Sequence, residues 1–170
     1  AGGGYTQLAI AAEEIARADA STSTILIVTA SLCNQPILKF GTEEQKRRFT
    51  VPLAKGDKIG AFGLTEPNAG SDAGGLQTTA TKNNGAYVLN GSKIFISNGD
   101  VADYSVVFAS QDKSSRSRGI TAFIVEKGMP GYSTRKQQGK LGIRGASTAE
   151  LFFQDCRVPA ENRLGDEGYG

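Results

Sequence analysis

Residues 60–75 read GAFGLTEPNAGSDAGG, a short apolar run that breaks into hydroxyl side chains, a carboxylate, a proline and closely spaced glycines. Glycine permits unusual backbone torsions and close approach, so such a loop brings N–H groups and small hydroxyls near a bound ligand. About one hairpin later, residues 90–99 read NGSKIFISNG and place an aromatic, an aliphatic and a hydroxyl side chain in a row on an expected strand. Together the two segments predict a flat apolar wall with hydrogen-bond donors, which suits a planar heteroaromatic cofactor.

On the C-terminal side of the first segment, the chain has the composition of β-strands. Branched and aromatic residues predict strands over residues 76–82, 86–89, 92–97, 104–110, 119–126, 132–137 and 149–154. Asn83-Asn84-Gly85 predicts a hairpin turn, and Asn90-Gly91 predicts a second turn that leads into the next strand. The polar, serine-rich residues 112–118 are expected to form a solvated connection.

On the N-terminal side, the periodicity is that of helices. Apolar residues recur at helical spacing at Leu8, Ala11, Ala12, Ile15 and Ala16. A second helix is expected to have Ser21 as its cap and to end before Pro36.

A third, short helix is expected over residues 43–49, before Pro52. Thr42 and Gln45 have the spacing of a capping box, in which each side chain bonds the other's backbone N–H. Residues 55–57, Lys-Gly-Asp, mark the end of the helical part. Helices followed by antiparallel strands imply an α+β fold with segregated layers.

Composition restricts the classes of function. The chain has 170 residues and a net charge of +2, with acidic and basic residues interspersed, so nothing indicates a nucleic-acid partner. No apolar run is long enough to cross a bilayer, which argues against a membrane partner. The N-terminus lacks a basic region followed by an apolar block, so a cytosolic chain without a signal peptide is expected.

The chain contains no histidine, which excludes Ser-His-Asp and Cys-His mechanisms within it. Proton transfer must use a carboxylate, a lysine or a tyrosine, or a group from another segment. Cys33 and Cys156 lie far apart and form no CxxC or zinc pattern, so we expect two free thiols and no metal site.

Residues 60–75 and 90–99 resemble the flavin-binding elements of the acyl-CoA dehydrogenase family. The first match is specific, because residues 63–66 (GLTE), residues 69–72 (AGSD) and Gly75 all fit the family's signature. Asn68 stands where many members have glycine, and asparagine also accepts left-handed torsions. The likeness continues over residues 36–46, 140–148 and 155–159. It is nearly chain-long and closest to the short-chain, or butyryl-CoA, branch.

The resemblance implies a division of the chain. Residues 1–57 would be the C-terminal part of the family's N-terminal helical domain. Residues 58–170 would be its antiparallel, β-barrel-like middle domain with the flavin-binding loops. The family's catalytic glutamate comes from a C-terminal helical domain that this sequence does not match. No catalytic residue is therefore expected in this chain.

The resemblance also implies an FAD site. The residues matching the family's cofactor contacts are Phe62, Leu64, Thr65, Gly70, Ser71, Phe95, Ile96 and Ser97. Thr65 would donate to the pyrimidine side of the isoalloxazine, where reduction builds up negative charge. Phe95 replaces the tryptophan of many relatives, keeping the flat wall without its N–H donor. Ser71 resembles the serine that contacts the CoA portion of the substrate. Taken without the resemblance, these residues also fit core packing, a strand end and a turn cap.

Other residues are expected to have structural roles, and three aliphatic residues have two possible roles. Glu66 and Asp72 are expected to brace the loop and not to act as catalytic carboxylates. Arg144 is assigned a structural role in a loop near the cofactor. Aliphatic side chains on the helix that forms the base of the family's acyl pocket suit a hydrocarbon tail and helix packing equally well: Ile25, Leu26 and Val28.

The function that the resemblance implies is α,β-dehydrogenation of short-chain acyl-CoA thioesters in fatty acid β-oxidation. Electrons would pass to electron-transfer flavoprotein, and the enzyme would be a homotetramer or homodimer. The location would be the cytoplasm of a bacterium or the mitochondrial matrix of a eukaryote. Two alternatives remain open on the same fold: a truncated, non-catalytic binding module, and an acyl-CoA oxidase or flavin monooxygenase.

Overall fold

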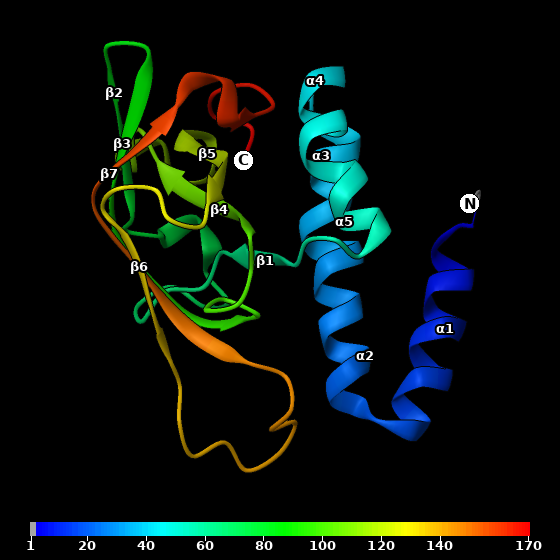
Figure 1. Ribbon diagram of the computed structural model, residues 1–170. Helices are drawn as coiled ribbons and strands as arrows, with labels where there is room; N and C mark the ends of the chain where they lie inside the picture. Colours follow the sequence, from blue (N-terminus) through cyan, green and yellow to red (C-terminus); the bar gives the residue numbers. More distant parts are fainter. Residues whose placement is uncertain (1–2) are drawn as a thin grey trace.

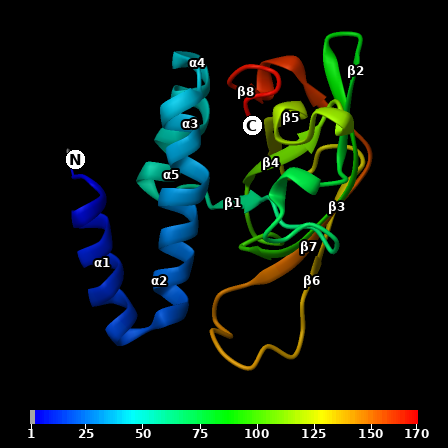
Figure 2. The same ribbon diagram turned by 180° about the vertical axis from the view of Figure 1, so that it is seen from behind.

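The computed structural model describes residues 3–170, in which a helical half stands beside a β half (Figure 1). The view from behind shows the same two layers, joined by the segment that leads into β1 (Figure 2). The helices are α1 (Tyr5–Ala18), α2 (Ala20–Ile27), α3 (Gln35–Phe40), α4 (Glu43–Gln45) and α5 (Val51–Lys55). π-helical turns join α2 to α3 and α4 to α5, over Val28–Asn34 and Lys46–Thr50. The predicted α+β fold with segregated layers is confirmed.

The first two helices were both expected from the sequence, but the start of the second differs from the prediction. The helix predicted from the periodic apolar residues is confirmed as α1. The predicted cap of the second helix, Ser21, is wrong by two residues, because Asp19 occupies that position. Its carboxylate accepts hydrogen bonds from the backbone N–H groups of Ser21 (3.2 Å) and Thr22 (2.9 Å). A carboxylate that reaches two of the unpaired N–H groups is among the preferred N-caps.

The predicted helix ends before Pro36 and Pro52 are also wrong. Each proline lies in the first turn of a helix, α3 or α5, directly after a wider π-helical turn. Proline is tolerated there because the π-helical turn before it already interrupts the regular i→i−4 ladder in which its missing N–H would take part. The chain therefore runs as one helical rod from α2 to α3 and as another from α4 to α5. The Thr42–Gln45 capping box is confirmed, with its two hydrogen bonds at 3.0 and 3.2 Å.

The β half is one sheet of eight strands. They are β1 (Gly60–Gly63), β2 (Thr79–Asn83), β3 (Ala86–Ser97), β4 (Tyr104–Ser110), β5 (Ile120–Glu126), β6 (Tyr132–Lys136), β7 (Thr148–Pro159) and β8 (Arg163–Leu164). The order is β6-β7-β3-β2-β4-β5-β8, and β1 pairs with β4. Pairing is antiparallel except for β1 with β4 and a single pair between β2 and β4. Among the described residues no ladder joins β6 to β8, so the barrel-like sheet is not closed.

The sequence between residues 86 and 97 forms one long strand, so the turn predicted at Asn90-Gly91 is wrong. The register with β7 shifts between Leu89 and Gly91, which marks a bulge. Gly91 has φ 144°, and a Cβ atom there would lie 2.6 Å from the Thr78 hydroxyl. Glycine is required here by the close approach of another segment, and not by a chain reversal.

The turn predicted at Asn83-Asn84-Gly85 is confirmed, with φ of 44° at Asn84 and 74° at Gly85. The strand predicted over residues 76–82 begins only at Thr79. The backbone N–H groups of Gln77 and Thr78 donate to the carboxylate of Glu66 and not to a neighbouring strand. The polar residues predicted as a loop contain a 3₁₀ turn, Lys113–Gly119.

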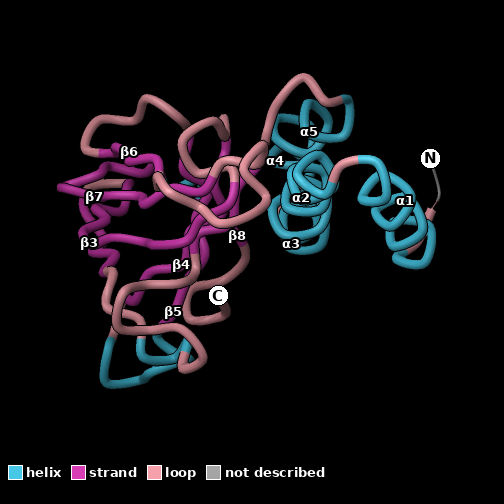
Figure 3. The backbone as a smooth tube through the Cα atoms, turned by 90° about the horizontal axis from the view of Figure 1, so that it is seen from below, coloured by secondary structure: helices cyan, strands magenta, loops and turns pink. Residues whose placement is uncertain are grey.

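The buried apolar side chains form two main cores. One lies within the β half and includes Tyr87, Phe123 and Phe153. The other joins the helices to the sheet through residues such as Ile37 and Ile124. Seen from below, α1 lies farthest from the sheet, with the other helices between (Figure 3). α1 has no buried residue. None of the helices within residues 3–170 has both the length and the apolar character needed to cross a bilayer.

Candidate functional site

The loop that follows β1 is held by a buried ion pair. The Lys93 ammonium lies 2.8 Å from a carboxylate oxygen of Glu66, and the two residues are 0 % and 5 % exposed. Burial raises the pKa of Glu66, but hydrogen bonds from Lys93, Thr78 and Gln77 outweigh it and hold that pKa below the ordinary value. A carboxylate bonded on both oxygens is poorly placed to accept a substrate proton. Glu66 braces the loop, as expected from the sequence.

The same loop reverses tightly after Glu66. Glu66 and Ala69 exchange backbone hydrogen bonds of 3.0 and 3.2 Å, so the chain turns back before the exposed Gly70 and Ser71. A Cβ atom at Gly70 would meet nothing within 4 Å, so this side of the loop is open. Asp72 receives two 2.8 Å bonds from the Arg116 guanidinium. It thus braces the loop against the 3₁₀ turn, as predicted.

The loop after β1 lies against β3 next to Phe95, the aromatic residue expected at the cofactor. The Ile94 N–H donates to the Thr65 carbonyl at 2.9 Å. The next residue, Phe95, has φ 60° and a 65 % exposed side chain, at a register shift between Lys93 and Ile96. A positive φ is unfavourable for a bulky residue and persists only where the surroundings impose it. The structure therefore holds a large flat side chain in solvent beside Thr65.

Ile96 and Ser97, which follow Phe95 on β3, are less exposed than Phe95. Ile96 is 2 % exposed and belongs to the core of the β half, so only its backbone is available to a ligand. Ser97 is half-buried and pairs with Thr148 on β7. The Thr65 carbonyl is bonded to Ile94, the residue before Phe95, and Ser97 follows two residues later on β3, so the three residues belong to neighbouring backbone. The role of each predicted site residue toward a cofactor stays a prediction.

Asn98, the residue after Ser97, was not predicted as part of the site. It is fully buried with φ 64°, and its side-chain N–H₂ donates to the carbonyls of Gly60 (3.0 Å) and Ile25 (3.5 Å). Asn98 therefore ties α2 and β1 to the end of β3. Asn98-Gly99 is a turn-type dipeptide, and that was the only signal available in the sequence.

The side chains of Phe62 and Leu64 lie in a different environment from that of Phe95. The Phe62 ring packs on Phe108, with centroids 5.1 Å apart, and lines a largely apolar groove of about 670 Å³ beside α3. Leu64 packs on a small cluster that includes Leu76. The Phe62 side chain is committed to the groove, so its backbone is the part that the loop offers to a ligand.

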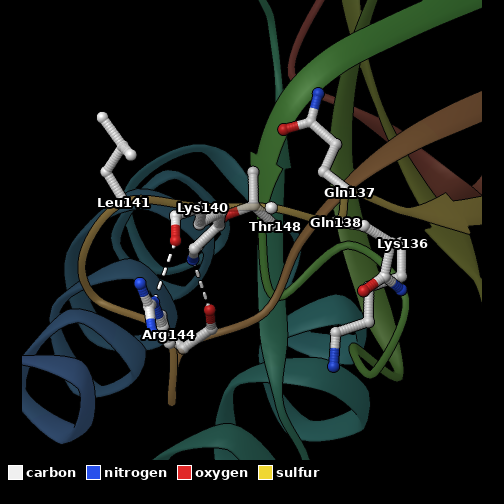
Figure 4. Close-up of a pocket in the computed structure, with 9 residues that line it drawn as sticks. Lys136, Gln137, Gln138, Lys140, Leu141, Arg144 and Thr148 are labelled. Atoms are coloured by element: carbon white, nitrogen blue, oxygen red, sulfur yellow. Dashed lines mark hydrogen bonds between the residues drawn. The ribbon is translucent and has the colours of Figure 1, made fainter.

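The loop between β6 and β7 forms a cationic pocket of about 400 Å³, lined by Lys136, Lys140 and Arg144 (Figure 4). Arg144 donates to the Lys140 carbonyl (3.0 Å), and the Lys140 ammonium donates to the Ala146 carbonyl (2.6 Å) and the Thr148 hydroxyl (3.0 Å). Arg144 thus braces its own loop, as predicted. The loop leads into Thr148 and so adjoins Ser97.

The predicted acyl-pocket residues lie on the rod formed by α2 and α3. Ile25 and Leu26 are half-buried, whereas Val28 is only 7 % exposed. The bond from Asn98 to the Ile25 carbonyl holds this part of α2 close to Ser97. Both interpretations of these side chains, packing and a pocket wall, are compatible with that position.

The residues present fit a flat aromatic cofactor. Phe95 offers an exposed flat ring, Thr65 and Ser97 offer hydroxyl donors near it, and the open side of the loop at Gly70 allows close approach. A metal is not indicated in the same way. No three side chains of His, Cys, Asp or Glu gather in residues 3–170 so that they could hold an ion.

Helices packed beside an open antiparallel sheet, with the Phe95 ring exposed on it, define an α+β protein with a surface suited to a flat ligand. The comparison with protein families makes this specific. The descriptions "Acyl-CoA dehydrogenase, N-terminal domain" and "Acyl-CoA dehydrogenase, middle domain" match residues 1–57 and 61–156. The chain belongs to the acyl-CoA dehydrogenase family, whose members are FAD-dependent oxidoreductases.

Individual relatives agree with this assignment. The chain is 57 % identical over 170 residues to the short-chain specific acyl-CoA dehydrogenase of Megasphaera elsdenii, covering 99 % of this chain and 44 % of the relative. The butyryl-CoA dehydrogenase structure from the same organism superposes with a TM-score of 0.92 at 58 % identity, over 94 % of this chain and 42 % of that one.

A chain in the structure of the electron transferring flavoprotein of Acidaminococcus fermentans superposes with a TM-score of 0.93 at 54 % identity, again over 94 % and 42 % of the two chains. The present chain therefore spans less than half the length of the relatives that it matches.

Proposed function

We propose that the complete protein is an FAD-dependent dehydrogenase that forms the α,β-double bond of short-chain acyl-CoA thioesters. The observation that carries this proposal is the exposed ring of Phe95 on β3, beside the backbone bond from Ile94 to the Thr65 carbonyl and two residues before Ser97. Residues 58–170 would be the middle domain with these residues, and residues 1–57 part of the N-terminal helical domain. Similarity to relatives described as short-chain specific supports the substrate class.

The chain's own residues would have separate tasks. When bound, FAD supplies a hydride acceptor. Phe95 gives its ring a flat apolar wall and keeps water from that side. The hydroxyls of Thr65 and Ser97 stabilise negative charge that develops on reduction, because fixed donors need no reorganisation. Backbone groups of Phe62, Leu64, Gly70 and Ile96 complete the contacts.

Substrate binding would use both halves of the chain. Ser71 is exposed at the open side of the loop and would contact the CoA portion. Ile25 and Leu26 on α2 would face the acyl group, held near Ser97 by Asn98. This arrangement orients the thioester between the helices and the cofactor surface, and orientation supplies much of the rate of such a reaction.

The α-proton would be removed by a carboxylate from outside this chain. Glu66, the carboxylate of the signature, is buried and bonded to Lys93, Thr78 and Gln77, so it is not free to act as a base. We further propose electron-transfer flavoprotein as the acceptor and a homodimer or homotetramer as the assembly. The match to a chain from the Acidaminococcus structure supports the choice of acceptor.

The test uses the complete protein, purified and examined under anaerobic conditions. A yellow protein with flavin absorbance that bleaches on adding butyryl-CoA supports the proposal. A colourless protein that does not respond to added FAD would contradict it. In a separate assay in air-saturated buffer, oxygen consumption on adding acyl-CoA would favour an oxidase. Bound FAD that no acyl-CoA reduces would favour a non-catalytic binding module.

A further inference from the structure

Two neighbouring residues of β3 hold three consecutive residues of the loop after β1. The Lys93 ammonium donates to the Leu64 carbonyl at 3.1 Å and to the Glu66 carboxylate at 2.8 Å. The Ile94 N–H donates to the Thr65 carbonyl at 2.9 Å. We call these bonds the Lys93–Ile94 clamp. They hold the backbone at Leu64 and Thr65 and the side chain of Glu66.

Stability alone explains the buried ammonium poorly. Lys93 is 0 % exposed, and an ammonium removed from water loses hydration that its partners only partly replace. Buried ion pairs can often be replaced by apolar side chains of similar size with little loss of stability. What the pair does provide is geometry, because Glu66 is fixed from the other side by the N–H groups of Gln77 and Thr78.

The Lys93–Ile94 clamp also adjoins Phe95, whose backbone has an unfavourable positive φ. Phe95 directly follows Ile94, and the register of β3 with β7 shifts between Lys93 and Ile96. The same short segment therefore sets the position of Thr65 on one side and presents Phe95 to solvent on the other. A displacement of either would change the distance between the hydroxyl and the aromatic wall.

We propose that Lys93 is a positioning residue of the flavin surface. Through its bond to the Leu64 carbonyl, it fixes where the Thr65 hydroxyl lies relative to Phe95, and thereby how strongly the site favours reduced over oxidised flavin. This inference rests on the proposed function, since it assigns Lys93 a role toward the same cofactor.

The experiment compares two variants of the complete protein. Glu66→Gln removes the carboxylate charge and leaves Lys93 able to donate to the Leu64 carbonyl. The double variant Glu66→Gln with Lys93→Met also removes that bond, with a side chain of similar length. Lys82→Met is the control, because Lys82 pairs with Glu167 and its side chain is 67 % exposed in the hairpin strand β2.

Three quantities are measured for each protein: the FAD affinity of the apoprotein, the two-electron potential of bound flavin, and the urea midpoint of unfolding. The double variant should bind FAD at least about tenfold more weakly than wild type, the size of one lost charge-assisted hydrogen bond. A tenfold loss in the preference for reduced flavin lowers its potential by about 30 mV. Glu66→Gln and Lys82→Met should keep affinity and potential near wild type, although Glu66→Gln unfolds at lower urea concentration.

Two results would overturn the inference. A double variant that matches wild type in affinity and potential would leave Lys93 only structural. A loss of affinity in Glu66→Gln as large as that in the double variant would show that the effect follows the ion pair and not the bond to Leu64. A wild-type protein that binds no FAD would instead contradict the proposed function itself.

Discussion

The two halves of the chain bury their side chains differently. In β5 the six residues from Ile120 to Val125 are all buried, and the β half has a core of its own. In α1, by contrast, no residue is buried, and Ile10 is 57 % exposed. The buried residues of the other helices, such as Ile37 and Phe49, lie mainly in the cluster shared with the sheet. The β half therefore carries the fold, and the helices depend on it for much of their burial.

The same contrast divides the proposed site. The predicted flavin contacts come from the β half, whereas the predicted acyl contacts, Ile25 and Leu26, come from α2. Asn98 links the two through its bonds to Gly60 and Ile25. Changes in the β half should therefore affect stability and flavin chemistry, and changes in the helices should mainly affect the substrate.

The largest expected effect is on the free energy of unfolding, and it distinguishes a buried isoleucine from an exposed one. Ile124→Ala removes a fully buried side chain between sheet and helices and should cost about 2–5 kcal/mol of unfolding free energy. The matched variant Ile10→Ala, on the exposed face of α1, should change it by no more than about 0.5 kcal/mol. Urea unfolding of the complete protein, followed by circular dichroism, measures both. Equal losses would show that α1 is packed as firmly as the sheet.

The next test concerns two glycines of the β half with positive φ. Gly91→Ala would place a Cβ atom 2.6 Å from the Thr78 hydroxyl, so strain and overpacking together should cost about 2–4 kcal/mol. Gly85→Ala meets no atom within 4 Å and should cost only the backbone strain, about 1–2 kcal/mol. The two midpoints of urea unfolding give the comparison. If Gly91→Ala were the milder change, the close approach to Thr78 would be wrong.

A functional comparison follows. Thr65→Val or Ser97→Ala should each remove one donor to reduced flavin, worth about 1.5–3 kcal/mol. That corresponds to roughly tenfold or more in the rate of flavin reduction, at about 1.4 kcal/mol per factor of ten. Stopped-flow reduction by butyryl-CoA measures the rate.

Leu26→Ala, on the helical half, is the companion variant. It should alter the preference among acyl lengths while the flavin potential stays at its wild-type value. Unchanged reduction rates in both Thr65→Val and Ser97→Ala would remove the roles assigned to these hydroxyls, even with the fold intact.

The smallest expected effect is a dependence on pH. Glu167 accepts a hydrogen bond from the Tyr87 hydroxyl and pairs with Lys82, and these contacts lower its pKa to about 2. Because the pKa is lower in the folded protein, the contribution is complete above the unfolded value of about 4.3 and is lost as the pH falls towards 2.

The Glu167 side chain is 38 % exposed, so solvent screening should limit this contribution to less than about 1 kcal/mol. Urea midpoints at pH 7 and pH 3 should differ less in Glu167→Gln than in wild type. Tyr87→Phe, which removes the first of the bonds, should reduce the difference in the same direction. A wild-type difference that persists in Glu167→Gln would place the acid sensitivity elsewhere.

Local signals predicted much of this fold correctly. The capping box at Thr42 and the hairpin at Asn84-Gly85 depend on torsions and hydrogen bonds within a few residues, and both are confirmed. Strand β4 begins and ends where branched and aromatic residues predicted it. Such features can be predicted because the interactions that specify them lie within the same short segment.

Other errors arose where distant segments meet. Gly91 was expected in a turn, yet its conformation is imposed by Thr78. Residues 76–78 were expected in a strand, yet Glu66 binds the N–H groups of Gln77 and Thr78. The partner of Lys93 and the two carbonyls bound by Asn98 depend on how β1, β3 and α2 come together in space. No periodicity or turn signal specifies those contacts, and they are the ones that arrange the candidate site.

The register of β3 with β7 also has a consequence for synthesis of the chain. β3 (Ala86–Ser97) needs β7 (Thr148–Pro159) as its neighbour, but β7 leaves the ribosome later. At about 5–20 residues per second, several seconds pass before the partner strand exists. During that interval β3 has one unpaired edge next to Phe95 and Ile96, a risk for association with other nascent chains. The strand that presents the proposed cofactor surface is thus also the one that most needs protection while the chain is being made.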